Sequence, residues 1–299
     1  MGKIAFVFSG QGDQYPGMGK ELVEKYPVAA DVFRMCDSLR PGTLQQCMEG
    51  TEEELKETAN TQPCLFAMEL AATEVLKETG ICPDVVAGFS LGEVVAATAA
   101  GILAKETGFE LVCKRGKFMQ QEAEKFDTAM AAVVKLTPAQ VEEVCAKYEG
   151  IYPVNYNCPG QVSVSGLAEV MPQFNESIRA AGGRVIPLKV KGAFHSPFMK
   201  EAADAFEEEL KAASMQEQMV PLYSNLTAQP YTSDVVELLS KQICNPVRWE
   251  EIIRNMIADG VDTFVEIGPG KTLVNMIRKI DAEVKVTSVS EVLAEVEAC

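Results

Sequence analysis

Short apolar runs alternate with longer amphipathic stretches along the first 125 residues. The short runs predict buried strands at 3–8 and 83–88. The longer patterns predict helices at 61–80, 91–103 and 105–125, and the second of these is apolar on nearly every side, which indicates a buried helix. Nearly continuous apolar strands that alternate with helices are typical of a parallel sheet covered on both faces. The pattern therefore predicts an α/β fold.

The pattern changes near residue 126. The following residues predict four strands and two helices in the order β-α-β-β-α-β, which is typical of a ferredoxin-like unit. These elements are expected at 128–134, 138–148, 152–157, 161–166, 168–181 and 184–190. We therefore predict a small ferredoxin-like subdomain at 126–190, inserted into a large domain made of 1–125 and 191–299.

The α/β pattern returns after this insertion. Helices are predicted at 196–213 and 245–260, and a strand, a loop and a helix at 262–280. The chain contains no internal repeat and no low-complexity segment. It therefore reads as one large domain that is interrupted once.

Composition excludes several classes of protein. The 299 residues carry 43 acidic and 27 basic side chains, a net charge of −16, so a nucleic-acid partner is not expected. No apolar run approaches the length of a membrane span, and the first run is too short for a signal peptide. The nine cysteines are scattered without a C-x-x-C pair, which argues against disulfides and zinc and favours a reducing compartment. We expect a cytoplasmic protein without a bound metal.

A serine between two glycines interrupts the apolar run 85–97. Gly88, Ser90 and Gly92 fit the pattern G-x-S-x-G, with a predicted strand before it and a predicted helix after it, and Glu93 follows directly. A sharp strand-to-helix turn of this kind exposes the serine hydroxyl above the sheet. The pattern alone is common, and a purely structural turn is the alternative. The context favours a nucleophile.

The chain has a single histidine, His195, between a predicted strand and a predicted helix. A serine needs a general base to act as a nucleophile, and only this residue can supply an imidazole. A lone histidine is more often a core or capping residue. Together with the G-x-S-x-G turn, however, His195 is the candidate base.

An oxyanion requires backbone N–H donors near the serine. The candidates are Leu91, directly after the serine, and Gln11, in the glycine-rich segment 9–19 after the first strand. That segment is not a dinucleotide-binding loop, because Tyr15 stands where the third glycine belongs. The segment GPGKT is not a phosphate-binding loop of the Walker A type either, because Val265 replaces its first glycine.

Arg115 lies within the predicted helix 105–125, next to Gly116. A glycine inside a helix costs about 1 kcal/mol relative to alanine, so its presence suggests that another segment packs close to the backbone here. The guanidinium of Arg115 could bind a carboxylate with two parallel hydrogen bonds. Taken alone, such an arginine is more often a surface residue.

Six motifs occur in the order found in one known family. They are FVFSGQGDQYPGMG, GFSLGE, RGKFMQ, GAFHSPFM, NPVRWEE and VEIGPGKTL. Through these motifs the sequence resembles, from end to end, the malonyl-CoA:acyl-carrier-protein transacylases of bacterial fatty-acid synthesis, which are related to the acyltransferase domains of polyketide synthases.

The resemblance implies a role for each candidate residue. Ser90 would be the nucleophile and His195 its base. In the family a backbone carbonyl of the NPV-x-W segment orients the histidine, and at that position stands Arg248. The remaining implied roles are the oxyanion N–H groups at Gln11 and Leu91 and the substrate carboxylate site at Arg115.

The resemblance also implies the fold and the substrates. The large domain would have an α/β-hydrolase-like core, with the active site in the cleft beside the small subdomain. Malonyl-CoA and acyl carrier protein would be the substrates, no cofactor would be needed, and we expect a monomer. The family usually has a histidine before the serine, where this chain has Phe89. Lys189 and Lys191 are candidates for docking an acidic carrier protein.

Three alternatives remain at this stage. A serine thioesterase or hydrolase would use the same turn with water as the acceptor, although its usual Ser-Asp-His order needs an acid between Ser90 and His195, and none stands out. An acyltransferase of a polyketide pathway would share the fold. A non-catalytic binding subunit would have lost the serine or the histidine, and this chain has both.

Overall fold

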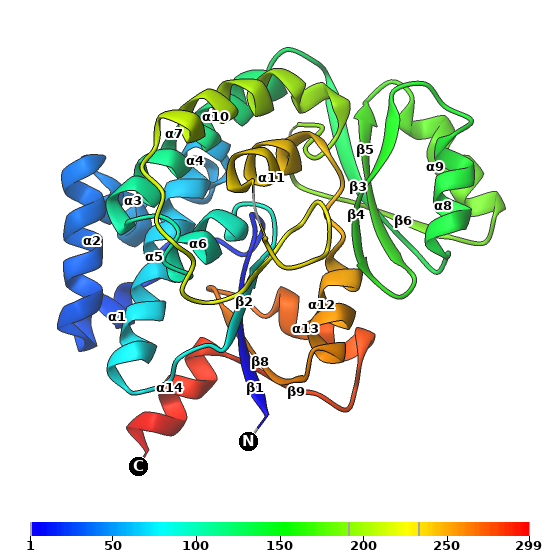
Figure 1. The fold of residues 1–299 in the computed structure, drawn as a ribbon. Coiled ribbons are helices and arrows are strands. Elements are labelled where there is room, and N and C mark those ends of the chain that lie inside the picture. Colours follow the sequence, from blue (N-terminus) through cyan, green and yellow to red (C-terminus); the bar gives the residue numbers. More distant parts are fainter. Residues whose placement is uncertain (1, 191, 233, 299) are drawn as a thin grey trace.

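Two β-sheets with their covering helices make up the molecule (Figure 1). The structure is a computed structural model and describes residues 2–190, 192–232 and 234–298. Five parallel strands form the larger sheet, and four antiparallel strands form the smaller one. The predicted combination of a parallel α/β sheet and a separate small sheet is confirmed.

The parallel sheet has the strand order β7-β2-β1-β8-β9. Its strands are β1 (Lys3–Phe8), β2 (Val85–Gly88), β7 (Leu222–Tyr223), β8 (Val261–Ile267) and β9 (Lys285–Ser288). Strand β1 is central and pairs in parallel with β2 on one side and with β8 on the other. The chain thus changes direction across the sheet at β1, and in such sheets ligands bind beyond the carboxyl ends of the strands at this point.

Helices cover both faces of the parallel sheet. Alternate residues of β1 point to opposite faces, so the strand contributes to a core on each side. Phe6 and Phe8 are completely buried in a large core with most of the helices, whereas Ala5 and Val7 face a second core. The helices of the first core are α1 (Lys20–Lys25), α2 (Pro27–Leu39), α3 (Thr43–Glu49), α4 (Glu52–Lys56), α5 (Thr58–Glu78), α6 (Gly92–Ala99), α7 (Lys105–Ala123), α10 (Lys200–Ala212), α11 (Val235–Lys241) and α14 (Val289–Glu297). The second core contains α12 (Trp249–Ala258) and α13 (Thr272–Ile280).

The smaller sheet has the strand order β4-β5-β3-β6 and lies to the right in Figure 1. Its elements are β3 (Thr128–Val134), α8 (Pro138–Cys145), β4 (Ile151–Cys158), β5 (Gln161–Leu167), α9 (Met171–Ala180) and β6 (Arg184–Pro187), in the predicted β-α-β-β-α-β order. Its strands pack on α8 and α9 through a core of their own, which includes Val133, Val164 and Phe174. One face of this sheet is therefore filled by its own helices.

The smaller sheet is joined to the larger part by backbone hydrogen bonds beside β4. The N–H of Val247 donates to the carbonyl of Val154 at 2.9 Å, and the N–H of Tyr156 donates to the carbonyl of Val247 at 2.9 Å. Val247 follows the short 3-10 helix η2 (Gln242–Cys244) and precedes α12. The segment between η2 and α12 is thus extended backbone held against β4, and for this reason the predicted helix 245–260 begins only at Trp249.

Most other predicted elements are present with shifted ends, and several short ones were not predicted. Helix α5 begins at Thr58, three residues before the predicted start. Strands β7 and β9 and helices α11 and α14 have no counterpart in the prediction, and β7 has only two residues. Elements this short carry too little periodicity to be recognised.

No helix within the described ranges has the length and apolar character needed to cross a membrane. The eight cysteines that the structure describes are free thiols, and five of them are buried: Cys36, Cys47, Cys64, Cys145 and Cys158.

Gly116 lies where α7 crosses α5, as its position in the sequence predicted. A Cβ atom on Gly116 would lie 2.9 Å from the carbonyl oxygen of Thr58 and 3.3 Å from both Cα of Ala59 and Cβ of Gln62. Two of these atoms are backbone atoms, which cannot move aside alone. The absence of a side chain at Gly116 thus allows α5 and α7 to approach closely.

We expect Gly116→Ala to lower the free energy of unfolding by about 1–2 kcal/mol, because overpacking against backbone atoms, at about 2–3 kcal/mol, outweighs the gain of about 1 kcal/mol in helix propensity. Urea denaturation measures the change. Glu110→Ala, at an exposed position of the same helix, is the control and should stay within about 0.5 kcal/mol of wild type. A Gly116→Ala variant as stable as wild type would contradict the close packing.

Candidate active site

Ser90 lies in the tight turn between β2 and α6. Its φ of 57° is in the left-handed region, which residues other than glycine rarely adopt. The flanking glycines permit the turn because the backbone closes on itself: a Cβ on Gly88 would lie 1.9 Å from the carbonyl carbon of Gly92, and a Cβ on Gly92 would lie 2.4 Å from the carbonyl oxygen of Phe8. The G-x-S-x-G pattern therefore forms the predicted strand–turn–helix.

Asn225, just after β7, fastens this turn. Its Oδ1 accepts a hydrogen bond from the N–H of Ser90 at 2.8 Å, and its Nδ2 donates to the carbonyl of Gly88 at 2.6 Å. Asn225 is completely buried. It was not predicted from the sequence, because nothing in its local pattern distinguishes it from a loop asparagine.

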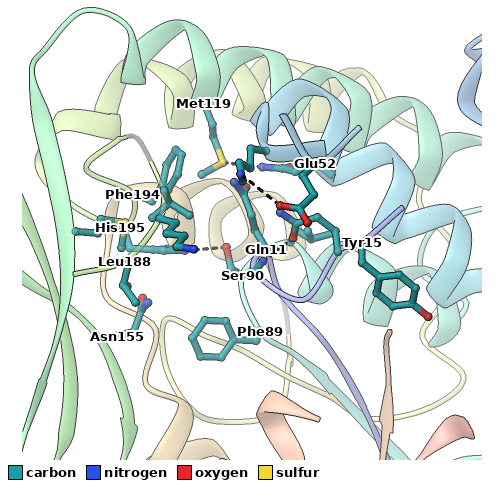
Figure 2. A pocket seen from close by; sticks show the side chains of 18 residues that line it. Gln11, Tyr15, Glu52, Phe89, Ser90, Met119, Asn155, Leu188, Phe194 and His195 are labelled. Carbon is teal, nitrogen blue, oxygen red and sulfur yellow. Dashed lines mark hydrogen bonds and ion pairs between the residues drawn. The ribbon is translucent and has the colours of Figure 1, made fainter. Parts of the chain in front are cut away.

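His195 reaches Ser90 from the loop before the 3-10 helix η1 (Pro197–Met199). Its Nε2 lies 2.7 Å from Oγ of Ser90 (Figure 2), and its Nδ1 lies 2.7 Å from the carbonyl oxygen of Gln242. A carbonyl can only accept, so Nδ1 carries the ring proton and Nε2 presents its lone pair to the serine hydroxyl. The N–H of His195 also donates to the carbonyl of Ile243 at 3.1 Å.

The expected carbonyl at Arg248 is not the one that orients His195. The carbonyl of Arg248 accepts from the N–H of Ile252 in the first turn of α12, and its side chain forms an ion pair with Glu251 at 2.6 Å. The prediction is therefore corrected to Gln242, six residues earlier. A backbone carbonyl is indeed the partner of His195, but the start of α12 already uses the carbonyl of Arg248.

Gln11 and Leu91 lie at the carboxyl ends of two neighbouring strands. Gln11 follows β1 and Leu91 follows the turn after β2, so the pairing of these strands brings the two residues to the same edge as Ser90. Among the described residues, neither backbone N–H has a hydrogen-bond partner. Both residues line the same cavity as Ser90. This placement is compatible with the expected pair of oxyanion donors, which must lie beside the nucleophile.

Arg115 lies beneath Ser90 and is completely buried. Its Nη1 donates to Oε1 of Gln62 at 2.8 Å, and its Nη2 donates to Oε1 of Gln242 at 2.9 Å and approaches Oγ of Ser90 at 3.3 Å. Its Nε has no hydrogen-bond partner among the described residues. Arg115 is thus no surface residue: its guanidinium is held by two neutral amides next to Ser90 and keeps a donor free.

Burial and the charge of Arg115 both determine the protonation of His195. Only 3% of His195 is exposed, and burial together with the nearby guanidinium lowers its pKa to about 4. Burial also lowers the pKa of Arg115 below its ordinary value, while the charge of Glu93 opposes this effect. At neutral pH the imidazole is therefore uncharged and able to accept a proton.

A cavity of about 440 Å³ opens at the Ser90–His195 pair, and both parts of the fold contribute to its walls (Figure 2). Lining residues include Gln11, Gln62, Met119, Met130, Asn155 and Leu188. The first three come from the larger part, and the last three from the smaller sheet and the segment that follows it. Within the described ranges, no three His, Cys, Asp or Glu side chains are grouped to hold a metal ion.

The comparisons with known proteins agree with this geometry. The family model for the acyl transferase domain matches residues 5–296. The chain is 42% identical to the malonyl CoA-acyl carrier protein transacylase of Bacillus subtilis (strain 168), over 97% of this chain and 94% of that protein. The chain belongs to the malonyl CoA-acyl carrier protein transacylase family.

Solved structures of such transacylases have the same fold. The crystal structure of the malonyl CoA-acyl carrier protein transacylase from Clostridium perfringens superposes with a TM-score of 0.94 at 34% identity, over 99% of this chain and 98% of that one. A second structure contains a type II polyketide synthase acyl-carrier protein in complex with its malonyl-transacylase. It has a TM-score of 0.91 at 32% identity and covers 96% of this chain and 94% of that one.

Phe89 is the residue that departs from the transacylase pattern expected above. Its ring packs edge-on against Trp249 with centroids 5.5 Å apart, and it lies on the side of Ser90 away from Met119 (Figure 2). The ring also lines an adjoining cavity of about 280 Å³. An apolar ring therefore stands between the two cavities, where it can offer contact area but no hydrogen bond to a substrate.

Of the two lysines named above as candidates for docking a carrier protein, the structure describes one. Lys189 is exposed and lines the cavity that contains Ser90. Lys191 lies outside the described residues. Lys189 is therefore the one of the two that the structure places beside the site.

We expect the rate of serine acylation, measured as kcat/KM for the acyl donor, to stay level as the pH falls through 6.5. It should then decline with a midpoint near 4, because the neutral imidazole is the active form and its pKa is lowered to about 4. Rapid-quench kinetics after a pH jump measure the profile, with circular dichroism at each pH as the control for folding. A midpoint near 6.5 in a folded protein would contradict the buried, Arg115-opposed base.

Proposed function

We propose that this protein transfers the malonyl group of malonyl-CoA to the phosphopantetheine thiol of an acyl carrier protein through an ester on Ser90. The observation that carries the proposal is the 2.7 Å contact between Nε2 of His195 and Oγ of Ser90, next to the buried guanidinium of Arg115. Membership of the transacylase family supports it. So does the similar structure of a malonyl-transacylase with its acyl-carrier protein.

The first half-reaction forms the malonyl ester. Nε2 of His195 accepts the proton of the Ser90 hydroxyl while Oγ attacks the thioester carbonyl. The negative charge that develops on the carbonyl oxygen is stabilised by the N–H groups of Gln11 and Leu91. When the carbon–sulfur bond breaks, the imidazolium returns its proton to the sulfur of CoA, which leaves as a thiol.

The second half-reaction reverses these steps with a different thiol. His195 accepts the proton of the phosphopantetheine thiol, the sulfur attacks the ester carbonyl, and the proton passes to Oγ of Ser90 as the ester bond breaks. Each half-reaction conserves protons and electrons, and side chains and backbone groups are sufficient for both. The proposal therefore assigns no metal or cofactor to the protein.

Arg115 gives the proposed site its preference for an acyl group with a free carboxylate. Nη2 of the guanidinium approaches Oγ of Ser90 at 3.3 Å, so a substrate carboxylate beside the serine would lie next to this charge. A malonyl group bound there would be held with its thioester beside the serine. An acetyl group would leave the guanidinium without a charged partner, which buried sites penalise.

The partner of His195 argues against the thioesterase alternative. Serine hydrolases of the usual kind orient the base with an aspartate or glutamate, whereas Nδ1 of His195 faces the carbonyl of Gln242. A carbonyl orients the ring without stabilising its charged form as strongly as a carboxylate does. The test between the two functions is the acceptor: a thioesterase releases malonate from malonyl-CoA whether or not carrier protein is present.

The finer structural predictions extend the proposal. The order β4-β5-β3-β6 supports a ferredoxin-like subdomain at 126–190, and the Ser90 turn above a parallel sheet supports an α/β-hydrolase-like large domain of 1–125 and 191–299. Free thiols fit the expected cytoplasmic location. The monomeric state stays a prediction, as does the assignment to fatty-acid synthesis.

Brief exposure to malonyl-CoA without carrier protein should add one malonyl group to the protein, and peptide mass spectrometry should locate it on Ser90. Holo acyl carrier protein should then remove it as malonyl-carrier thioester. Ser90→Ala is the control and should remain unmodified. An intact wild-type protein that forms no ester, or one that carries the malonyl group elsewhere, would overturn the proposed mechanism.

Arg115→Ala should reduce kcat/KM for malonyl transfer by about 10²–10³-fold, as expected for the loss of a charge-assisted bond in a buried site. Acetyl transfer should fall much less, so the ratio of malonyl to acetyl transfer is the decisive measurement. The ratio is insensitive to a partial loss of folded protein. An unchanged ratio would show that Arg115 does not bind the substrate carboxylate.

A further inference from the structure

Glu93, in the first turn of α6, is a completely buried carboxylate directly below the Ser90 turn. Its Oε1 accepts hydrogen bonds from the N–H of Asn225 at 2.9 Å and from the hydroxyl of Tyr231 at 2.8 Å. Its Oε2 accepts from Nε2 of Gln242 at 3.0 Å. Burying a carboxylate without an ion pair in direct contact is costly, and the proposed mechanism gives Glu93 no chemical step.

The carboxylate determines which way the side-chain amide of Gln242 points. Oε2 of Glu93 accepts, so only the NH₂ group of Gln242 can face it. The same NH₂ group donates to the carbonyl of Ser90 at 2.8 Å. The amide oxygen of Gln242 is thereby left facing Nη2 of Arg115 at 2.9 Å. Reversing the amide would bring donor against donor at Arg115 and remove the donor from Ser90.

Glu93 also reaches the Ser90 turn along a second route. It accepts from the backbone N–H of Asn225, and the side chain of Asn225 holds the N–H of Ser90 and the carbonyl of Gly88. One carboxylate is therefore connected to the left-handed backbone of Ser90 and, through Gln242, to the guanidinium of Arg115.

We propose that Glu93 is a positioning residue for malonyl transfer, which fixes the amide orientation of Gln242 and through it the guanidinium of Arg115. The inference rests on the proposed function and adds a residue to it. The positioning by Glu93 should affect the preference for malonyl over acetyl groups, because that preference depends on Arg115.

The orientation of Gln242 is the same in both protonation states of Glu93. Burial raises the pKa of Glu93 to about 8. A proton on this carboxyl group belongs on Oε1, where the hydroxyl of Tyr231 can accept it, since the NH₂ group of Gln242 at Oε2 cannot. Oε2 remains an acceptor, and the amide of Gln242 keeps its direction.

The isosteric variant Glu93→Gln tests the inference. Its single oxygen is needed by Asn225 and Tyr231, so its NH₂ group faces the NH₂ group of Gln242 and forces that amide to turn. We expect KM for malonyl-CoA to rise about tenfold and the malonyl-to-acetyl ratio to fall about tenfold, the scale of one charge-assisted hydrogen bond. A residue that only supports the fold would lower stability without changing either quantity in the folded protein.

Glu266→Gln is the matched control. Glu266 is equally buried and accepts from the N–H groups of Leu273 and Val274 at the start of α13, with no contact to Ser90, Gln242 or Arg115. This variant should lose stability but keep the wild-type KM and the wild-type ratio. Equal effects of the two substitutions on the ratio would overturn the role of Glu93.

Gln242→Ala provides an independent test, since it removes the amide and keeps the carbonyl that faces His195. It should lower the malonyl-to-acetyl ratio as Glu93→Gln does, and adding Glu93→Gln to it should change the ratio by less than about twofold, because the two act along one route. If Glu93→Gln fails to fold, Gln242→Ala decides: an unchanged ratio overturns the proposal.

The two levels of inference fail differently. A wild-type protein that forms no malonyl ester on Ser90 removes the proposed function and the inference with it. A wild-type protein that forms the ester, together with a folded Glu93→Gln variant of wild-type KM and ratio, removes the inference alone.

Discussion

The hydrogen bond between Nε2 of His195 and Oγ of Ser90 is the contact on which the rest of the site depends. It joins residues 105 positions apart, and both have a left-handed backbone, with φ of 60° and 57°. Such conformations cost on the order of 1–3 kcal/mol each and persist only where the surroundings impose them. Asn225 imposes the conformation at Ser90, while the carbonyls of Gln242 and Ile243 hold the ring and the backbone of His195. The strained conformations are thus held by contacts between segments that are far apart in the sequence.

The electrostatics of the site depend on the pairing of His195 with a neutral carbonyl and not with a carboxylate. A carboxylate beside His195 would raise its pKa more than the carbonyl does, and burial together with the nearby Arg115 keeps the imidazole uncharged well below neutral pH. The guanidinium is in turn held by the neutral amides of Gln62 and Gln242, and it forms no ion pair with a described residue. A positive charge that is solvated by neutral groups remains available to an incoming carboxylate. A direct ion pair inside the protein would have occupied it.

The sequence allowed the prediction of those parts of the site whose chemistry is written in neighbouring residues. Ser90 with its two glycines, the lone His195, and Gln11 after the first strand could each be identified from local context, and the small sheet from its order of elements. Gln242 could not, because it acts through a backbone carbonyl that every residue possesses. The expected carbonyl was therefore placed six residues too late, at Arg248. Asn225 and Glu93 also escaped prediction, since their importance comes from contacts across more than 130 positions of the chain.

The segment from η2 to the start of α12 contributes both to the catalytic pair and to the small sheet. At one end, Gln242 holds the imidazole of His195. Five residues later, the N–H and the carbonyl of Val247 both form hydrogen bonds with β4, next to Asn155, which lines the cavity. The cavity wall at β4 and the carbonyl of Gln242 that orients His195 are consequently connected by one short segment of the chain. A widening of the cleft at β4 would also displace the carbonyl of Gln242 that orients the imidazole. The shape of the cavity and the orientation of the base are therefore coupled.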